Sequence, residues 1–135
     1  MIFIDSNIWC YYFDSSAKEH NSVASYIDNV IDKTEIAMNS LIIMEISHYL
    51  IKNLGPIKGK EKIEKILSFP FLIIDFDYNM LVSSITMLAK YSHSGIGGRD
   101  ATILATMAKL GIKKLVTHDS SFKSIDFIEV MDPVR

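Results

Sequence analysis

Short apolar segments alternate with helix-like segments along the chain, and this alternation constrains the fold more than any other feature of the sequence. Each apolar segment is short enough to be a strand that is buried on both faces. The segments between them carry apolar residues at the spacing of an amphipathic helix. Buried strands separated by helices predict an α/β protein, a three-layer α/β/α sandwich with a central, mostly parallel sheet. The strand candidates are Met1–Ile4, Ile36–Met38, Phe71–Ile74, Lys114–Thr117 and Phe127–Val130.

Capping residues and glycines place the expected helices. Polar caps accept hydrogen bonds from the first helical turn, and glycine often follows the last turn. Gly55-Pro56 is expected to end the third helix and Gly111 the last, while Ser94–Gly98 is expected to be the most flexible loop. On the fourth helix Ile63, Ile66 and Leu67 are expected to face inward. The helices are expected from Ser6 or Asn7 to Phe13, over 17–33, from Asn39 or Ser40 to about Asn53, over Lys60–Ser68, from Asp77 to about Ser92, and over Arg99–Leu110.

The length of the chain predicts one domain, 1–135, with one modest core. Such a core leaves apolar surface that a partner subunit can cover. Asp5 interrupts the N-terminal apolar run, so no signal peptide is expected, and no run approaches the ~20 apolar residues that span a membrane. The single cysteine, Cys10, cannot form an internal disulfide. We therefore expect a buried thiol and a reducing, cytoplasmic compartment.

The charge is unevenly distributed along the chain. The formal net charge is −2, which gives no overall basic signal for nucleic acid. Residues 1–50 nevertheless carry two lysines and seven acids, whereas 51–135 carry twelve basic residues and nine acids. A basic stretch in the second part is either a solvated helix face or a surface that follows a phosphate backbone. It comprises Lys52, Lys58, Lys60, Lys62 and Lys65, with Glu61 and Glu64 between them.

Four acidic residues lie just beyond a predicted strand or early in a predicted helix. Asp5 follows the first strand, and Asp119 follows the strand Lys114–Thr117. Glu45 lies in the helix after the second strand, and Asp100 lies in the first turn of the helix after the glycine loop. In open parallel sheets, sites form beyond the carboxyl ends of the strands. We therefore expect these four side chains to converge.

Each acid also has a structural explanation by itself. Asp5 suits a strand end or a cap, and Glu45 suits the exposed face of an amphipathic helix. Asp100 in a first helical turn favours the helix dipole, and Asp119 suits a turn. The functional interpretation therefore depends on the convergence of all four rather than on any one of them.

Converging carboxylates require a compensating cation, because they cannot all stay ionised side by side. Mg²⁺ or Mn²⁺ prefers such oxygen ligands and polarises phosphate esters. No cluster of cysteine and histidine argues for zinc. The four histidines, His20, His48, His93 and His118, are scattered, and only His118 lies beside one of the acids.

Four segments of the sequence together resemble the PIN-domain family, and more narrowly its VapC-type toxin branch. The resemblance covers nearly the whole chain, and the order and separation of the segments give it its specificity. The segments are Met-Ile-Phe-Ile-Asp-Ser-Asn at the start, Ile-Ile-Met-Glu-Ile-Ser around Glu45, Gly-Gly-Arg-Asp-Ala-Thr-Ile-Leu-Ala-Thr-Met-Ala around Asp100, and Leu-Val-Thr-His-Asp-Ser-Ser-Phe around Asp119.

The resemblance implies a metal-dependent endoribonuclease that cleaves RNA and uses Mg²⁺ or Mn²⁺. Asp5, Glu45, Asp100 and Asp119 match the acidic quartet of the family. Asp5 and Asp100 would contact the metal directly, while Glu45 and Asp119 would bind a second ion, orient water or act through the hydration shell. Asn7 and Thr117 match polar positions that support the site by hydrogen bonding, although a helix cap and a strand-end hydroxyl are their structural alternatives.

The resemblance also implies partners. Many members of the family pair with an antitoxin, whose peptide enters a groove near the site, and many form homodimers. Four aromatic residues in the first helix suit either the core or such a partner surface. They are Trp9, Tyr11, Tyr12 and Phe13.

Other functions remain open from the residues alone. An RNA-processing nuclease without an antitoxin, or a non-catalytic binding module, suits the same fold. A haloacid-dehalogenase-type phosphatase shares an aspartate after the first strand, but it needs a second acid where Asn7 stands and a later aspartate pair. A response-regulator receiver needs two adjacent acids after that strand, whereas Ile4 and Ser6 flank Asp5.

Overall fold

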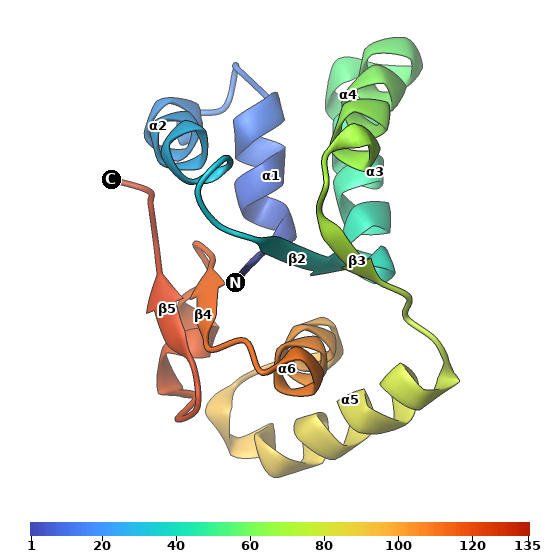
Figure 1. Cartoon of the computed structure of the whole chain (residues 1–135), viewed down its shortest axis with the longest axis vertical. Helices are drawn as coiled ribbons and strands as arrows, with labels where there is room; N and C mark the ends of the chain where they lie inside the picture. The colour runs from blue at the N-terminus through green and yellow to red at the C-terminus, as the bar shows by residue number, and fades with distance from the viewer.

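The computed structural model describes all 135 residues, and a five-stranded sheet in the order β3-β2-β1-β4-β5 runs through its centre (Figure 1). All four strand pairings are parallel. β1 is the middle strand, so Phe3 pairs with Ala37 on one side and Leu115 on the other. The strands are β1 (Ile2–Ile4), β2 (Ile36–Asn39), β3 (Leu72–Ile74), β4 (Lys114–Val116) and β5 (Glu129–Met131).

Helices cover both faces of the sheet, which confirms the predicted three-layer α/β/α sandwich. Figure 1 shows α1 to α4 on one face of the sheet, and α5 and α6 on the other. Two 3₁₀ turns, η1 (Ser92–Ser94) and η2 (Ser120–Ser124), were not predicted. The helices are α1 (Ser6–Phe13), α2 (His20–Val30), α3 (Ser40–Leu54), α4 (Pro56–Ser68), α5 (Tyr78–Lys90) and α6 (Gly98–Leu110).

The central strands are buried because both of their faces meet helices. Phe3, Ile4 and Met38 have no exposed surface, and they belong to one continuous apolar cluster with Trp9 of α1. Cys10 belongs to the same cluster, and burial raises the pKa of its thiol to about 12. Cys10 is therefore a structural thiol, as predicted.

Several helix ends differ from the predictions. The side chain of Asp5, rather than Ser6 or Asn7, accepts the hydrogen bond that caps α1. The second helix occupies only His20–Val30 of the predicted 17–33. α4 starts four residues before Lys60, because proline is well tolerated in the first helical turn. Leu67 was predicted to face inward, but its side chain is 55% exposed.

The last strand also differs from its prediction. It spans Glu129–Met131 rather than Phe127–Val130, because an edge strand that is only partly buried has a weak apolar pattern. No helix in the structure is both long and apolar enough to cross a membrane.

Candidate active site: an acidic cluster around Arg99

The pairing of β1 with β4 brings Asp5 and Thr117 together at the carboxyl edge of the sheet. Both residues are fully buried, and each directly follows its strand. One carboxylate oxygen of Asp5 accepts a hydrogen bond from the Ser6 amide at 2.6 Å. Its other oxygen accepts a hydrogen bond from the Thr117 hydroxyl at 2.8 Å. Asp5 is thus both the cap of α1 and a buried charge at the edge of the sheet.

Two helices bring further carboxylates to Asp5. α3 follows β2, the other neighbour of β1, and carries Glu45 in a half-buried position. α6 carries Asp100 in its first turn, where the side chain accepts a hydrogen bond from the Gly97 amide at 3.3 Å. Asp100 is only 8% exposed. A favourable interaction with the dipole of α6 at a solvent-exposed helix end is therefore not its only role.

The guanidinium group of Arg99 joins these three carboxylates. Its Nε donates a hydrogen bond to Glu45 at 2.6 Å, and its Nη1 donates one to Asp100 at 2.8 Å. Its Nη2 donates to Asp5 and, at 2.8 Å, to the Ser6 hydroxyl. Charge-assisted bonds of this kind are among the stronger hydrogen bonds in proteins. Arg99 therefore fixes three acids that come from different elements of the chain.

Sequence reasoning did not identify Arg99 as a site residue. One available signal was the need of several converging carboxylates for a cation, combined with the position of Arg99 directly before Asp100. The chain has only one other arginine, Arg135. An adjacent acid and base usually form ordinary surface charges, however, and the sequence alone does not place the guanidinium against Asp5 or Glu45.

Asp119 lies beside this cluster but does not contact Arg99. Its carboxylate accepts a hydrogen bond from the Ser121 amide at 2.9 Å. Its own amide donates to the Thr117 hydroxyl at 3.0 Å, and the Ser121 hydroxyl donates to Asp100 at 3.4 Å. Arg99 therefore contacts three of the four predicted acids. The fourth acid, Asp119, is linked to Asp100 through hydrogen bonds of Ser121.

Asn7 supports the carboxyl edge of the sheet rather than capping α1. Its Nδ2 donates to the Thr117 hydroxyl at 3.5 Å, and its Oδ1 accepts from the His118 amide at 3.4 Å. The imidazole of His118 lies 2.9 Å from Asp132, in an exposed position without a hydrogen bond to the acidic cluster. His118 thus contributes its backbone to the site and not its side chain.

Burial is the largest single influence on the pKa values of Asp5, Glu45 and Arg99. It raises the pKa of Asp5, although Arg99, Thr117 and Ser6 act in the opposite direction. Burial also raises the pKa of Glu45, again against the effect of Arg99. Burial alone would lower the pKa of Arg99, but the surrounding carboxylates outweigh it, so that pKa is raised. Arg99 is therefore cationic, and it faces three acids with a single positive charge.

The residues of the cluster suit a hard divalent cation in their chemistry, but their present arrangement does not coordinate one. All four acids offer oxygen, the ligand atom that Mg²⁺ and Mn²⁺ prefer. Oε1 of Glu45 is buried without a hydrogen-bond partner, which leaves an acceptor free. No three Asp, Glu, His or Cys side chains lie close enough together to hold an ion. The central cation of the cluster is instead the guanidinium of Arg99.

Comparisons with known proteins agree with this fold. The profile described as PIN domain matches residues 2–128. Ribonuclease VapC6 of Methanocaldococcus jannaschii is 28% identical over 149 residues, which cover 96% of this chain and 95% of that protein.

Solved structures show the same architecture. The structure of Mycobacterium tuberculosis VapC20, a toxin that cleaves the sarcin-ricin loop, superposes with a TM-score of 0.82 at 18% identity and covers 96% of this chain and 98% of that one. A toxin-antitoxin complex from Klebsiella pneumoniae contains a chain with a TM-score of 0.74 at 21% identity, and the match covers 98% of each chain.

Proposed function

The profile match spans nearly the whole chain, so the protein belongs to the PIN domain family, and we propose that it is a metal-dependent endoribonuclease. Its substrate is RNA, its cofactor is Mg²⁺ or Mn²⁺, and residues 1–135 act as a single nuclease domain. The similarity to Ribonuclease VapC6 and to the Klebsiella toxin-antitoxin complex supports the further proposal that it is the toxin of a type II pair that acts in the cytoplasm.

The convergence of Asp5, Glu45 and Asp100 at the carboxyl edge of the sheet carries this proposal. Asp5 and Asp100 would hold the ion directly, and Glu45 and Asp119 would hold a second ion or orient a water molecule. Thr117 and Asn7 hold Asp5 and the adjacent backbone in place. The bound ion supplies polarisation of the phosphodiester and a more acidic water.

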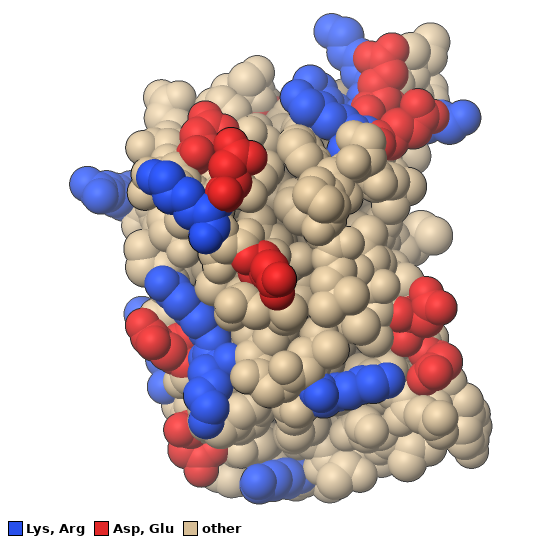
Figure 2. Space-filling view, viewed as in Figure 1, with Lys and Arg blue, Asp and Glu red and all other residues tan.

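A shallow pocket beside Glu45 offers room for the RNA backbone. The pocket has a volume of about 450 Å³ and is lined by His48, Tyr49, Lys52 and Asn53 in addition to Glu45. Lys52 lies about two turns along α3 from Glu45 on the same face, so it supplies a positive charge to the pocket, as a phosphate requires. On the face seen in Figure 2, basic and acidic side chains are intermixed, with no continuous basic surface. Local positions such as Lys52, rather than net charge, therefore attract the substrate.

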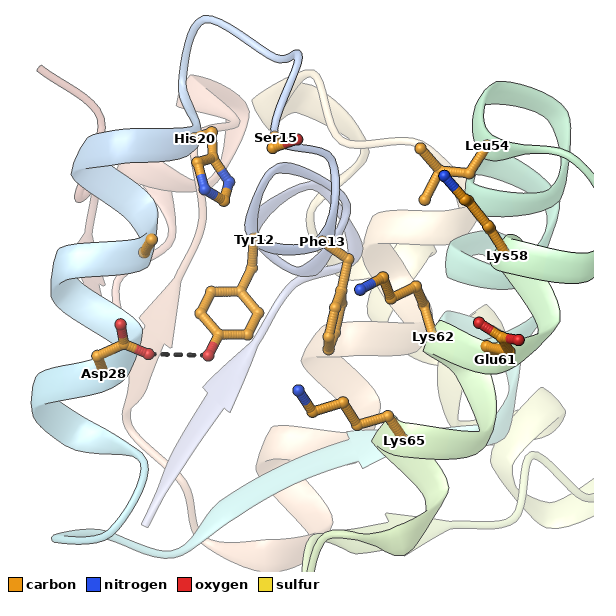
Figure 3. Close-up of a pocket in the computed structure, with 11 residues that line it drawn as sticks. Tyr12, Phe13, Ser15, His20, Asp28, Leu54, Lys58, Glu61, Lys62 and Lys65 are labelled. Atoms are coloured by element: carbon orange, nitrogen blue, oxygen red, sulfur yellow. Dashed lines mark hydrogen bonds between the residues drawn. The ribbon is translucent and has the colours of Figure 1, made fainter.

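A groove between α2 and α4 suits the peptide of an antitoxin. Figure 3 shows Tyr12 and Phe13 of α1 between the two helices, with lysines projecting from α4. The groove has a volume of about 510 Å³, and Tyr12 is fixed in it by a 2.8 Å hydrogen bond to Asp28. Its three lysines, Lys58, Lys62 and Lys65, favour a peptide that carries acidic as well as apolar side chains.

We also propose a homodimer through the outer face of α5. Four exposed apolar residues lie at the spacing of one helical stripe, and α5 forms an outer edge of the molecule (Figure 1). Contiguous exposed apolar surface of this kind marks interaction sites. The stripe consists of Tyr78, Leu81, Val82 and Ile85, which are 42–76% exposed.

Cleavage of end-labelled structured and single-stranded RNAs tests the proposed activity. We expect internal cleavage with Mg²⁺ or Mn²⁺ and none with a chelator. Asp5→Asn should abolish cleavage while the protein still folds, because the amide keeps the shape of the side chain but loses the charge. Asp32→Asn is the control, since Asp32 is exposed in the loop before β2. Cleavage by Asp5→Asn at the parental rate would refute the proposed site.

The position of Arg99 favours one alternative function, a non-catalytic binding module. In such a module the guanidinium of Arg99, rather than a metal ion, would compensate the charge of the acids. Such a module would bind RNA without cleaving it. The same experiment therefore separates the two functions, because a nuclease releases internal fragments only when the metal is present.

A further inference from the structure

We propose that Arg99 is an internal cation that holds the acidic cluster together in the metal-free protein and competes with the catalytic metal for it. This inference rests on the proposed metal-dependent function. It assigns Arg99 a regulatory role: the metal must displace its guanidinium before the site is complete.

The contacts of Arg99 are the first reason. Its guanidinium donates hydrogen bonds to one oxygen each of Asp5, Glu45 and Asp100 and to the Ser6 hydroxyl. Four of its five N–H groups are thus engaged, three of them with the acids proposed to bind metal. An exposed arginine that merely balances surface charge would not reach carboxylates on three separate elements.

Steric and electrostatic exclusion is the second reason. Mg²⁺ or Mn²⁺ binds carboxylate oxygens at about 2.0–2.2 Å, and Mg²⁺ requires near-octahedral geometry. The guanidinium nitrogens already lie 2.6 Å and 2.8 Å from Glu45 and Asp100. A divalent ion among the same oxygens would contact the guanidinium and be repelled by its charge. The two cations therefore occupy the cluster alternately.

The partial exposure of Arg99 allows its side chain to leave the cluster. Its side chain is 32% exposed, so the guanidinium is already at the mouth of the site rather than enclosed by the core. Rotation about side-chain bonds can therefore carry the charge to solvent without moving α6.

Binding of Mn²⁺, measured by calorimetry on the full chain, tests this competition. We expect Arg99→Gln to bind Mn²⁺ about tenfold or more tightly than the parent, because the competing charge is gone. In the absence of metal, the same variant should melt roughly 10 °C lower, since buried Asp5 loses its cation. Mn²⁺ should then raise its melting temperature more than that of the parent. Arg135→Gln, at the exposed C-terminus, is the control and should behave as the parent.

The outcomes separate this inference from the proposed function. If the parent cleaves RNA with Mn²⁺ but Arg99→Gln binds Mn²⁺ no more tightly, the competition is refuted and the nuclease remains. If neither protein binds Mn²⁺, the inference is refuted, and the cleavage assay decides the function independently. Should Arg99→Gln fail to fold, Arg99→Lys decides, because one ammonium group cannot reach all three acids. Tighter binding than in the parent supports the competition, and unchanged binding refutes it.

Discussion

At the scale of single residues, the hydroxyl of Thr117 connects the two halves of the acidic site. It donates to Asp5, and it accepts from the amide of Asp119. The Nδ2 of Asn7 also approaches it at 3.5 Å. This small side chain thus fixes the position of the buried Asp5 carboxylate relative to the backbone of a second acid, Asp119.

Thr117→Val should therefore damage the site while preserving the shape of the core. Asp5 loses its hydroxyl donor inside the protein, and an unsatisfied buried group costs about 1–3 kcal/mol of the free energy of unfolding. The loss of that donor should also raise the pKa of Asp5 further. Because the carboxylate must be ionised to bind metal, the onset of cleavage should move to higher pH.

Urea unfolding and a pH profile of RNA cleavage measure both effects. The matched control is Thr86→Val on exposed α5, where the hydroxyl bonds only to the backbone of its own helix. An unchanged pH profile in Thr117→Val, with stability lost, would show that Thr117 has a purely structural role.

The sequence revealed the acids but not the group that joins them. Asp5, Glu45 and Asp100 could be placed because parallel strands with short connections bring their carboxyl ends to one edge. Arg99 was missed because a one-dimensional pattern gives the identity of a long side chain but not its direction. Its guanidinium reaches carboxylates that are 54 and 94 residues away in the sequence.

At the scale of elements, the sequence predicted a helix start most accurately where the capping residue does not also belong to the acidic cluster. Asp77 caps α5 as predicted, and Asn39, one of the two caps predicted for its helix, caps α3; each side chain accepts a hydrogen bond from the third helical amide. Ser6 or Asn7 was the expected cap of α1, and a cap was only an alternative interpretation of Asp5, which both caps that helix and joins the acidic cluster. Gly55-Pro56 was interpreted only as a stop. It ends α3 and also begins α4, because proline loses no hydrogen bond in a first turn.

The hairpin of α3 and α4 depends on one glycine. A Cβ at Gly59 would lie 2.6 Å from the Cα of Ile51 and 2.7 Å from its backbone nitrogen, so the two helices are in backbone contact there. Gly59→Ala would improve the intrinsic helix propensity of α4 by up to about 1 kcal/mol. The clash with backbone should nevertheless prevail and lower the free energy of unfolding by about 1–3 kcal/mol.

This prediction is checked by urea unfolding of Gly59→Ala beside Lys60→Ala. Lys60 is exposed, and its only ion pair is a surface contact with Glu64, so the control should change stability by less than about 0.5 kcal/mol. Because α3 carries Glu45, a displaced hairpin should also slow RNA cleavage. A stabilised Gly59→Ala would mean that the helices separate at little cost.

At the scale of the whole molecule, the strand order explains why so small a chain can build a buried polar site. β1 lies between β2 and β4, so the segments that follow these three strands emerge side by side. α6 approaches the same edge from the opposite layer and adds Arg99 and Asp100. The alternation of strands and helices predicted the layers and the parallel sheet, since both follow from buried apolar segments. The same pattern does not predict which partners bind the outer surface, because the sequence of one chain does not identify the molecules that contact it.

The outer face of α5 is the surface on which a partner can be tested directly. Tyr78, Leu81, Val82 and Ile85 form an exposed apolar stripe, whereas Met80 and Ser84 of the same helix are buried. A second copy that presents the same stripe would bury both faces by twofold symmetry, the commonest arrangement of homodimers.

Ile85→Glu should then place two carboxylates in the interface and convert the dimer to a monomer, as measured by light scattering coupled to size-exclusion chromatography. Ser83→Glu adds the same charge at an exposed position about 100° or more around α5 from every residue of the stripe, so it should leave the dimer intact. A parent protein that is monomeric at all concentrations, or two variants that dissociate equally, would exclude this stripe as the dimer interface.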